Sequence, residues 1–104
     1  MKSRKAGANE YDHFDAVNPG TSQKVTVSGS SSQSAALGAN TTIVRVTSDT
    51  NCYLAFGVSP TAASDGTSLL LPAGVIEYFG VDKASKIAVI QQAAGGTLYI
   101  TEGA

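Results

Sequence analysis

Charged side chains are scarce in this sequence, and their scarcity removes several classes of function. Only 14% of the 104 residues are Asp, Glu, Lys or Arg, against roughly 25% in an average soluble domain. The formal net charge is −1, so the sequence lacks the basic surplus with which proteins bind nucleic acid. We therefore expect no nucleic-acid partner.

Long apolar runs and paired cysteines are also missing. No apolar stretch approaches the roughly 18 residues that a membrane helix needs, and none follows the basic N-terminal residues as in a secretory signal. The single cysteine, Cys52, excludes an internal disulfide. We expect no membrane partner and a protein that is used without export through a signal peptide.

The residue types that carry catalysis do not form a catalytic or metal-binding pattern. His13 is the only histidine, and its spacing to Asp12 and Asp15 matches no metal-ligand pattern. Cys52 has no histidine near it in sequence and shares a strand register with Leu54, which favours a core thiol over a nucleophile. The sequence thus predicts no enzyme, no cofactor and no metal site.

Four of the five acidic residues after position 22 lie at or near predicted turns. There Asp supports the backbone through local hydrogen bonds, so a structural role is expected for Asp49, Asp65, Asp82 and Glu102. Glu77 lies in the middle of a predicted strand and has two possible partners, Lys86 across a hairpin or Arg45 across a subunit boundary.

Two parts of different character make up the chain. Residues 1–22 form a polar N-terminal arm that ends in the turn-forming sequence Asn18-Pro19-Gly20. The arm is either a disordered tail or an extended segment that contacts a neighbouring subunit through Tyr11, Phe14 and Val17. Residues 23–104 form a single domain of short β-type segments and turns, without a sustained helical period.

The spacing of these segments predicts an all-β fold, a single small antiparallel β-sandwich or jelly-roll-like barrel of about seven or eight strands. Short turns at residues 49–51 and 82–85 predict two hairpins. The expected strands are residues 23–29, 41–48, 52–58, 69–71, 75–81, 86–92 and 97–102, and residues 30–34 are either a loop or a polar edge strand. The side chains expected to point inward from residues 52–58 are Cys52, Leu54, Phe56 and Val58.

Several of these segments are apolar on both faces, most clearly residues 69–71 and 87–90. An antiparallel sheet with one wet face alternates apolar and polar residues instead. We expect a partner, either a second copy or a different protein, to cover the second face. The alternative is that a small barrel or jelly roll buries such residues at its ends. The expected contact residues are Tyr11, Phe14, Leu69, Leu70, Tyr78 and Phe79.

Tyrosines on the strand surfaces offer a second kind of contact. Tyr53, Tyr78 and Tyr99 each stand beside a residue that is expected to face the core, so their rings could stack on sugars. Tryptophan, the strongest platform of this kind, is absent.

Residues 35–103 resemble small virion proteins of tailed bacteriophages. The segments that carry the resemblance are VRVTSDTNCYLAFG, the LPAG turn before EYF, and the closing pair KIAVIQ and GGTLYITE. The resemblance implies a β-rich, non-enzymatic protein that is made in the host cytoplasm and assembled in many copies on the virion. It carries no defined binding residues.

Among the roles in that group, we expect a capsid decoration or cement protein on the capsid surface that bridges and stabilises neighbouring capsid subunits. Its partner would be the major capsid protein or another virion protein, and it would form a homo-oligomer, either a dimer or a trimer. The alternative is a tail, connector or fibre-associated β module that binds a carbohydrate or receptor.

Overall fold

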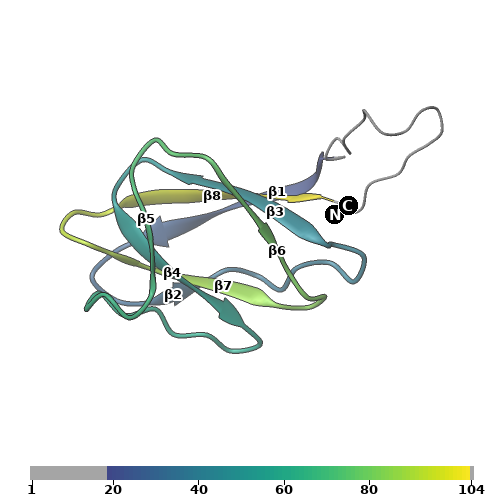
Figure 1. Cartoon of the computed structure of the whole chain (residues 1–104), viewed down its shortest axis with the longest axis horizontal. Helices are drawn as coiled ribbons and strands as arrows, with labels where there is room; N and C mark the ends of the chain where they lie inside the picture. The colour runs from purple at the N-terminus through teal and green to yellow at the C-terminus, as the bar shows by residue number, and fades with distance from the viewer. Residues whose placement is uncertain (1–18, 104) are drawn as a thin grey trace, which may run out of the picture.

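The computed structural model describes residues 19–103, which form eight strands and no helix (Figure 1). None of these residues therefore forms a helix that could cross a bilayer. Tyr11, Phe14 and Val17 lie outside the described residues. The strands are β1 (Pro19–Val27), β2 (Ser32–Gln33), β3 (Ile43–Ser48), β4 (Cys52–Gly57), β5 (Leu69–Leu71), β6 (Glu77–Gly80), β7 (Lys86–Gln91) and β8 (Gly96–Gly103).

The strands make two four-stranded antiparallel sheets, in the order β1-β8-β3-β6 (sheet A) and β2-β7-β4-β5 (sheet B). The pairs β1·β8, β2·β7, β3·β6 and β4·β5 are those of one long antiparallel ribbon whose closed end joins β4 to β5. Rolling up this ribbon places β3 beside β8 and β4 beside β7. The predicted all-β fold is confirmed, and the strand order is that of a double-sheet jelly roll.

Both predicted hairpins are wrong. β3 belongs to sheet A and β4 to sheet B, so the turn at residues 49–51 crosses from one sheet to the other. The same holds for β6 and β7 across residues 82–85. A short turn brings two strand ends together, but it does not make the strands pair. β3 pairs with β8 along its whole length instead.

The core lies between the sheets and is built by the period-two alternation of their strands. Val44 and Val46 of β3 are fully buried. Burying one side chain of this size contributes about 1.5–3 kcal/mol. The other members of the core cluster are Val25, Val27, Leu37, Cys52, Leu54, Leu71, Ile87, Val89, Leu98 and Ile100.

The inward set predicted for residues 52–58 is only half right. Cys52 and Leu54 are buried, but Phe56 is 36% exposed and Val58 is 80% exposed. The cause is the shortness of β5, which pairs with β4 only as far as Leu54. Phe56 lies beyond that cover and packs against the ring of Phe79, with the ring centroids 5.1 Å apart.

The first strand begins earlier than predicted. β1 starts at Pro19 rather than at Gln23, so Pro19 and Gly20 are in a strand and not in a turn. Proline is tolerated there because β1 is an edge strand and Pro19 is its first residue. The polar edge strand that was one of two possibilities for residues 30–34 is present as β2.

The turn between β7 and β8 packs closely on β1, and this contact yields a stability prediction. A Cβ at Gly95 would lie 2.8 Å from the backbone oxygen of Val27. We expect Gly95→Ala to lower the free energy of unfolding in urea by about 1–3 kcal/mol, since backbone must move to relieve the clash.

Gly29→Ala is the matched control. A Cβ at Gly29 would meet nothing nearer than the Gln91 side chain, at 3.7 Å, so its effect should stay within about 0.5 kcal/mol. Equal effects of the two substitutions would contradict the packing described for Gly95.

Candidate functional site

The outer face of sheet B carries an apolar row that crosses three strands. Leu70 of β5 lies opposite Tyr53 of β4, which lies opposite Ile90 of β7. Side chains paired in this way have Cβ atoms about 4.5–5.5 Å apart, so the three form a continuous strip, here called the Leu70–Tyr53–Ile90 row. Leu70 is 45% exposed, and Tyr53 and Ile90 are half-buried.

Next to this row, part of the outer face of sheet B is covered by a loop of the same chain. The loop that follows β4 is tied to the β2 side of the sheet by two hydrogen bonds, from Gln33 Nε2 to the Pro60 oxygen and from the Ala62 N–H to Ser31 Oγ, both 2.9 Å. Because β7 lies between β4 and β2, the loop passes over β7. Ala88, on the outer side of β7, is fully buried.

The expectation that a partner covers the second face of residues 87–90 is therefore wrong for Ala88. A sequence pattern shows that cover is needed but not which segment supplies it. The loop does not bury the whole face, since Leu70 remains substantially exposed.

The four predicted contact residues within the described part of the chain do not share one surface. Leu70 points outward from sheet B, while its neighbour Leu69 stands at the sheet edge, opposite the buried Leu54, and is 44% exposed. Tyr78 is 52% exposed and belongs to sheet A. Phe79 lies opposite the buried Val44 and packs against the core.

The outer face of sheet A has a different chemistry. Tyr99 of β8, 48% exposed, has Lys24 of β1 on one side and Thr47 of β3 on the other. In the adjacent cross-strand row, Arg45 lies between Tyr78 and Thr101. Together these six side chains form what we call the tyrosine face: Lys24, Arg45, Thr47, Tyr78, Tyr99 and Thr101.

The structure thus brings two of the three predicted sugar-stacking tyrosines to one face, Tyr78 and Tyr99, and places Tyr53 on the opposite side of the molecule. A shallow groove of about 410 Å³ runs beside Tyr99 and is lined by Ser22, Gln23, Lys24, Ile100 and Thr101 as well.

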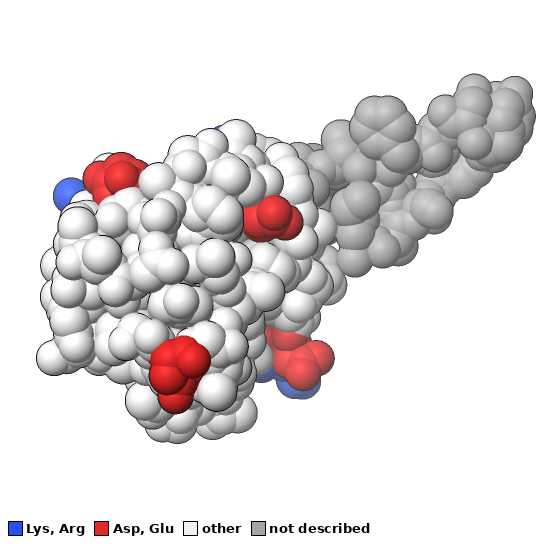
Figure 2. Space-filling model, turned by 60° about the vertical axis from the view of Figure 1, so that its left-hand side comes forward, with Lys and Arg blue, Asp and Glu red and all other residues white. Residues whose placement is uncertain are grey.

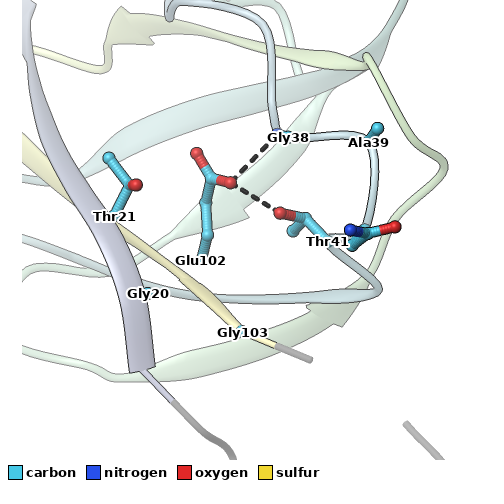
Figure 3. A pocket seen from close by; sticks show the side chains of 8 residues that line it. Gly20, Thr21, Gly38, Ala39, Thr41, Glu102 and Gly103 are labelled. Atoms are coloured by element: carbon cyan, nitrogen blue, oxygen red, sulfur yellow. Dashed lines mark hydrogen bonds between the residues drawn. The ribbon is translucent and has the colours of Figure 1, made fainter.

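Glu102 is the one charged side chain among residues 19–103 that is buried, with 8% exposed. Its Oε1 accepts hydrogen bonds from the Gly38 N–H at 3.0 Å and from Thr41 Oγ1 at 2.5 Å (Figure 3). Both donors belong to the loop between β2 and β3, so Glu102 fastens this loop to β8. The cavity beside it, about 300 Å³, is lined also by Gly20 and Thr21 of β1.

The sequence contained a signal for the position of Glu102 that the prediction of a turn acid did not use. Leu98, Ile100 and Glu102 follow one another at period two, and the first two belong to the core. The alternation therefore already placed Glu102 on the inner face of β8.

Of the other described acids, Asp49 and Asp65 accept side-chain hydrogen bonds, and only those of Asp65 are local, as predicted for a turn acid. Asp49 Oδ1 accepts a bond from the Thr97 N–H at 2.7 Å, which joins the turn after β3 to β8. Asp65 accepts bonds from the N–H and the Oγ1 of Thr67, and these bonds, chiefly the side-chain one, lower the pKa of Asp65.

Residues 19–103 contain no group of three or more His, Cys, Asp and Glu side chains that could share a metal ion. His13 lies outside the described residues. Cys52 is fully buried, as predicted. Burial raises the pKa of its thiol above the ordinary value of 9.0. A hydrogen bond with Ser48 lowers the pKa by a smaller amount, and the nearby Asp49 charge raises it slightly.

No protein-family model matches this chain, and neither the curated proteins nor the solved structures compared with it gave a match. The resemblance to virion proteins therefore stays a prediction.

Replacing Glu102 should show how much the fold depends on the buried carboxylate. Glu102→Ala removes two hydrogen bonds to a charged group, each worth about 1.5–3 kcal/mol, so we expect a loss of at least that amount in urea unfolding. Glu77→Ala is the control, since Glu77 is an exposed edge residue. Similar losses for the two variants would contradict the anchoring role of Glu102.

Cys52 should be unreactive in the folded protein. We expect negligible reaction with a thiol-specific reagent at pH 8 and complete reaction in urea, because the thiolate is disfavoured by burial. A raised thiol pKa also means that the folded state loses stability as the pH rises above 9.0, the ordinary thiol value. Rapid labelling of the native protein would refute a core thiol.

Proposed function

We propose that this chain is a non-enzymatic structural protein of a tailed-phage virion, a capsid decoration protein that bridges and stabilises neighbouring capsid subunits. The observation that supports the proposal best is the Leu70–Tyr53–Ile90 row. It is a continuous apolar strip on the outer face of a sheet, beside which the chain's own loop covers Ala88.

The charge distribution favours docking through this face. The outward positions of sheet B's described strands carry one charged side chain, Lys86, which lies at the start of β7. Removing charges from water is costly unless they find partners, so a face with few charges meets little electrostatic opposition when it is covered. The gain from covering it is about 25 cal/mol for each Å² of apolar surface.

The sparse charge on the described residues is suited to close contact with neighbours. On the face shown in Figure 2, acidic and basic side chains of these residues occur singly or in small groups among uncharged ones. A row of three side chains gives a weak contact on its own. Many copies on one particle would act together, because linked contacts bind far more strongly than one contact alone.

The function can be tested by binding the full-length protein to capsids that lack it, measured by co-sedimentation. Leu70→Ser should weaken binding at least about tenfold, equivalent to about 1.4 kcal/mol, because it puts a hydroxyl into the apolar row. Ile76→Ser should bind like the wild type, since Ile76 is 49% exposed but lies just before β6, in the other sheet.

The bound protein should also raise the temperature at which the capsid disrupts. Light scattering on the same variants tests the expected dimer or trimer. The proposal fails if the wild type binds no virion component, or if Leu70→Ser binds as tightly as Ile76→Ser.

A further inference from the structure

We propose that the tyrosine face of sheet A is a binding site for an acidic oligosaccharide. This inference concerns a different surface from the proposed capsid contact. The two sheets pack on each other through their inner faces, so their outer faces point in opposite directions (Figure 1). A molecule docked through sheet B therefore leaves the tyrosine face free for a second ligand.

Two tyrosine rings of this face are exposed. Tyr78 and Tyr99 each expose about half of their surface, at 52% and 48%. Both stand on strands that are paired on at least one side, so their positions are fixed by the sheet register. The electron-rich face of an aromatic ring is complementary to the C–H face of a sugar, and the groove beside Tyr99 offers room for the rest of the sugar ring.

One pair of residue types, a tyrosine and a cation, occurs twice on this face. Each tyrosine has a cation directly opposite on the neighbouring strand, Lys24 beside Tyr99 and Arg45 beside Tyr78. Strand geometry puts the two tyrosines roughly 12 Å apart. Such a repeated pair of a stacking ring and a cation fits a polymer in which sugar rings and negative charges also repeat.

The tyrosine face carries positive charge. Lys24 and Arg45 are the charged side chains at the outward positions of sheet A's described strands, and both are positive. The sheet's two acids, Glu77 and Glu102, pair with the inward-facing Val46 and Val44 and so belong to the other side. A positive pair with no acidic side chain among the outward positions of these described strands favours a ligand with carboxylate or sulfate groups over a neutral one.

Hydroxyl groups complete the face. Thr47 lies next to Tyr99, and Thr101 lies next to Arg45. Thr101 Oγ1 is within hydrogen-bond distance of Ser22 Oγ, at 3.0 Å. Each hydroxyl can donate one hydrogen bond and accept others, which matches the mixed donor and acceptor pattern of sugar hydroxyls.

Calorimetry with the full-length protein tests this site, using oligosaccharides built from uronic acid, sialic acid or sulfated sugars, with neutral dextran oligosaccharides and single-stranded DNA for comparison. We expect saturable binding of at least one acidic oligosaccharide and none of dextran. Tyr99→Ala and Lys24→Gln should each weaken this binding at least about tenfold.

The chain offers a matched control for each variant on the opposite face. Tyr53→Ala removes a tyrosine and Lys86→Gln a lysine from the outer side of sheet B, and both should bind the oligosaccharide like the wild type. Thermal melting of all four variants identifies any loss that comes from unfolding.

Three results would overturn the inference: no binding of any acidic oligosaccharide, equal losses for the variants of the two faces, or tighter binding of single-stranded DNA that depends on Tyr99. Leu70→Ser separates this site from the proposed capsid contact, because it should lose capsid binding and keep oligosaccharide binding.

Discussion

The fold depends on burying the inner faces of two sheets against each other. Every strand contributes to one sheet or the other, and only β4 and β5 are consecutive strands within the same sheet. All other connections carry the chain from one layer to the other. A set of strands with one strongly apolar face each can satisfy this requirement by rolling up a single antiparallel ribbon, and the observed strand pairs follow that scheme. The inner faces are buried in this packing, and both outer faces remain available to bind other molecules.

The two outer faces differ in chemistry, and the difference supports separate roles. Sheet B presents the apolar Leu70–Tyr53–Ile90 row beside a loop of its own chain, whereas sheet A presents tyrosines, threonines and two cations. We propose that the first docks on a capsid and the second binds an acidic sugar. Because the faces point in opposite directions, the two contacts do not compete. Neither role requires a catalytic group.

The structural features that depend on the local order of residues could be predicted from the sequence. The all-β fold and the burial of Cys52 follow from residue order and period, whereas residue order left a loop and the polar edge strand β2 as two alternatives. Strand pairing did not follow, because a turn of a few residues is equally compatible with a hairpin and with a crossing between sheets. The exposure of Phe56 depended on where its neighbour β5 ends. The two candidate faces likewise required the strand order, since Tyr78 and Tyr99 lie on different strands that β3 separates.

The central claim is that sheet B faces the partner and sheet A faces away. Oxidative footprinting of side chains tests it directly, by comparing the free protein with the protein bound to the particle. The account predicts that Tyr53 and Leu70 lose reactivity on binding while Tyr78 and Tyr99 keep theirs. Protection of Tyr78 and Tyr99 with unchanged Tyr53 and Leu70 would contradict it.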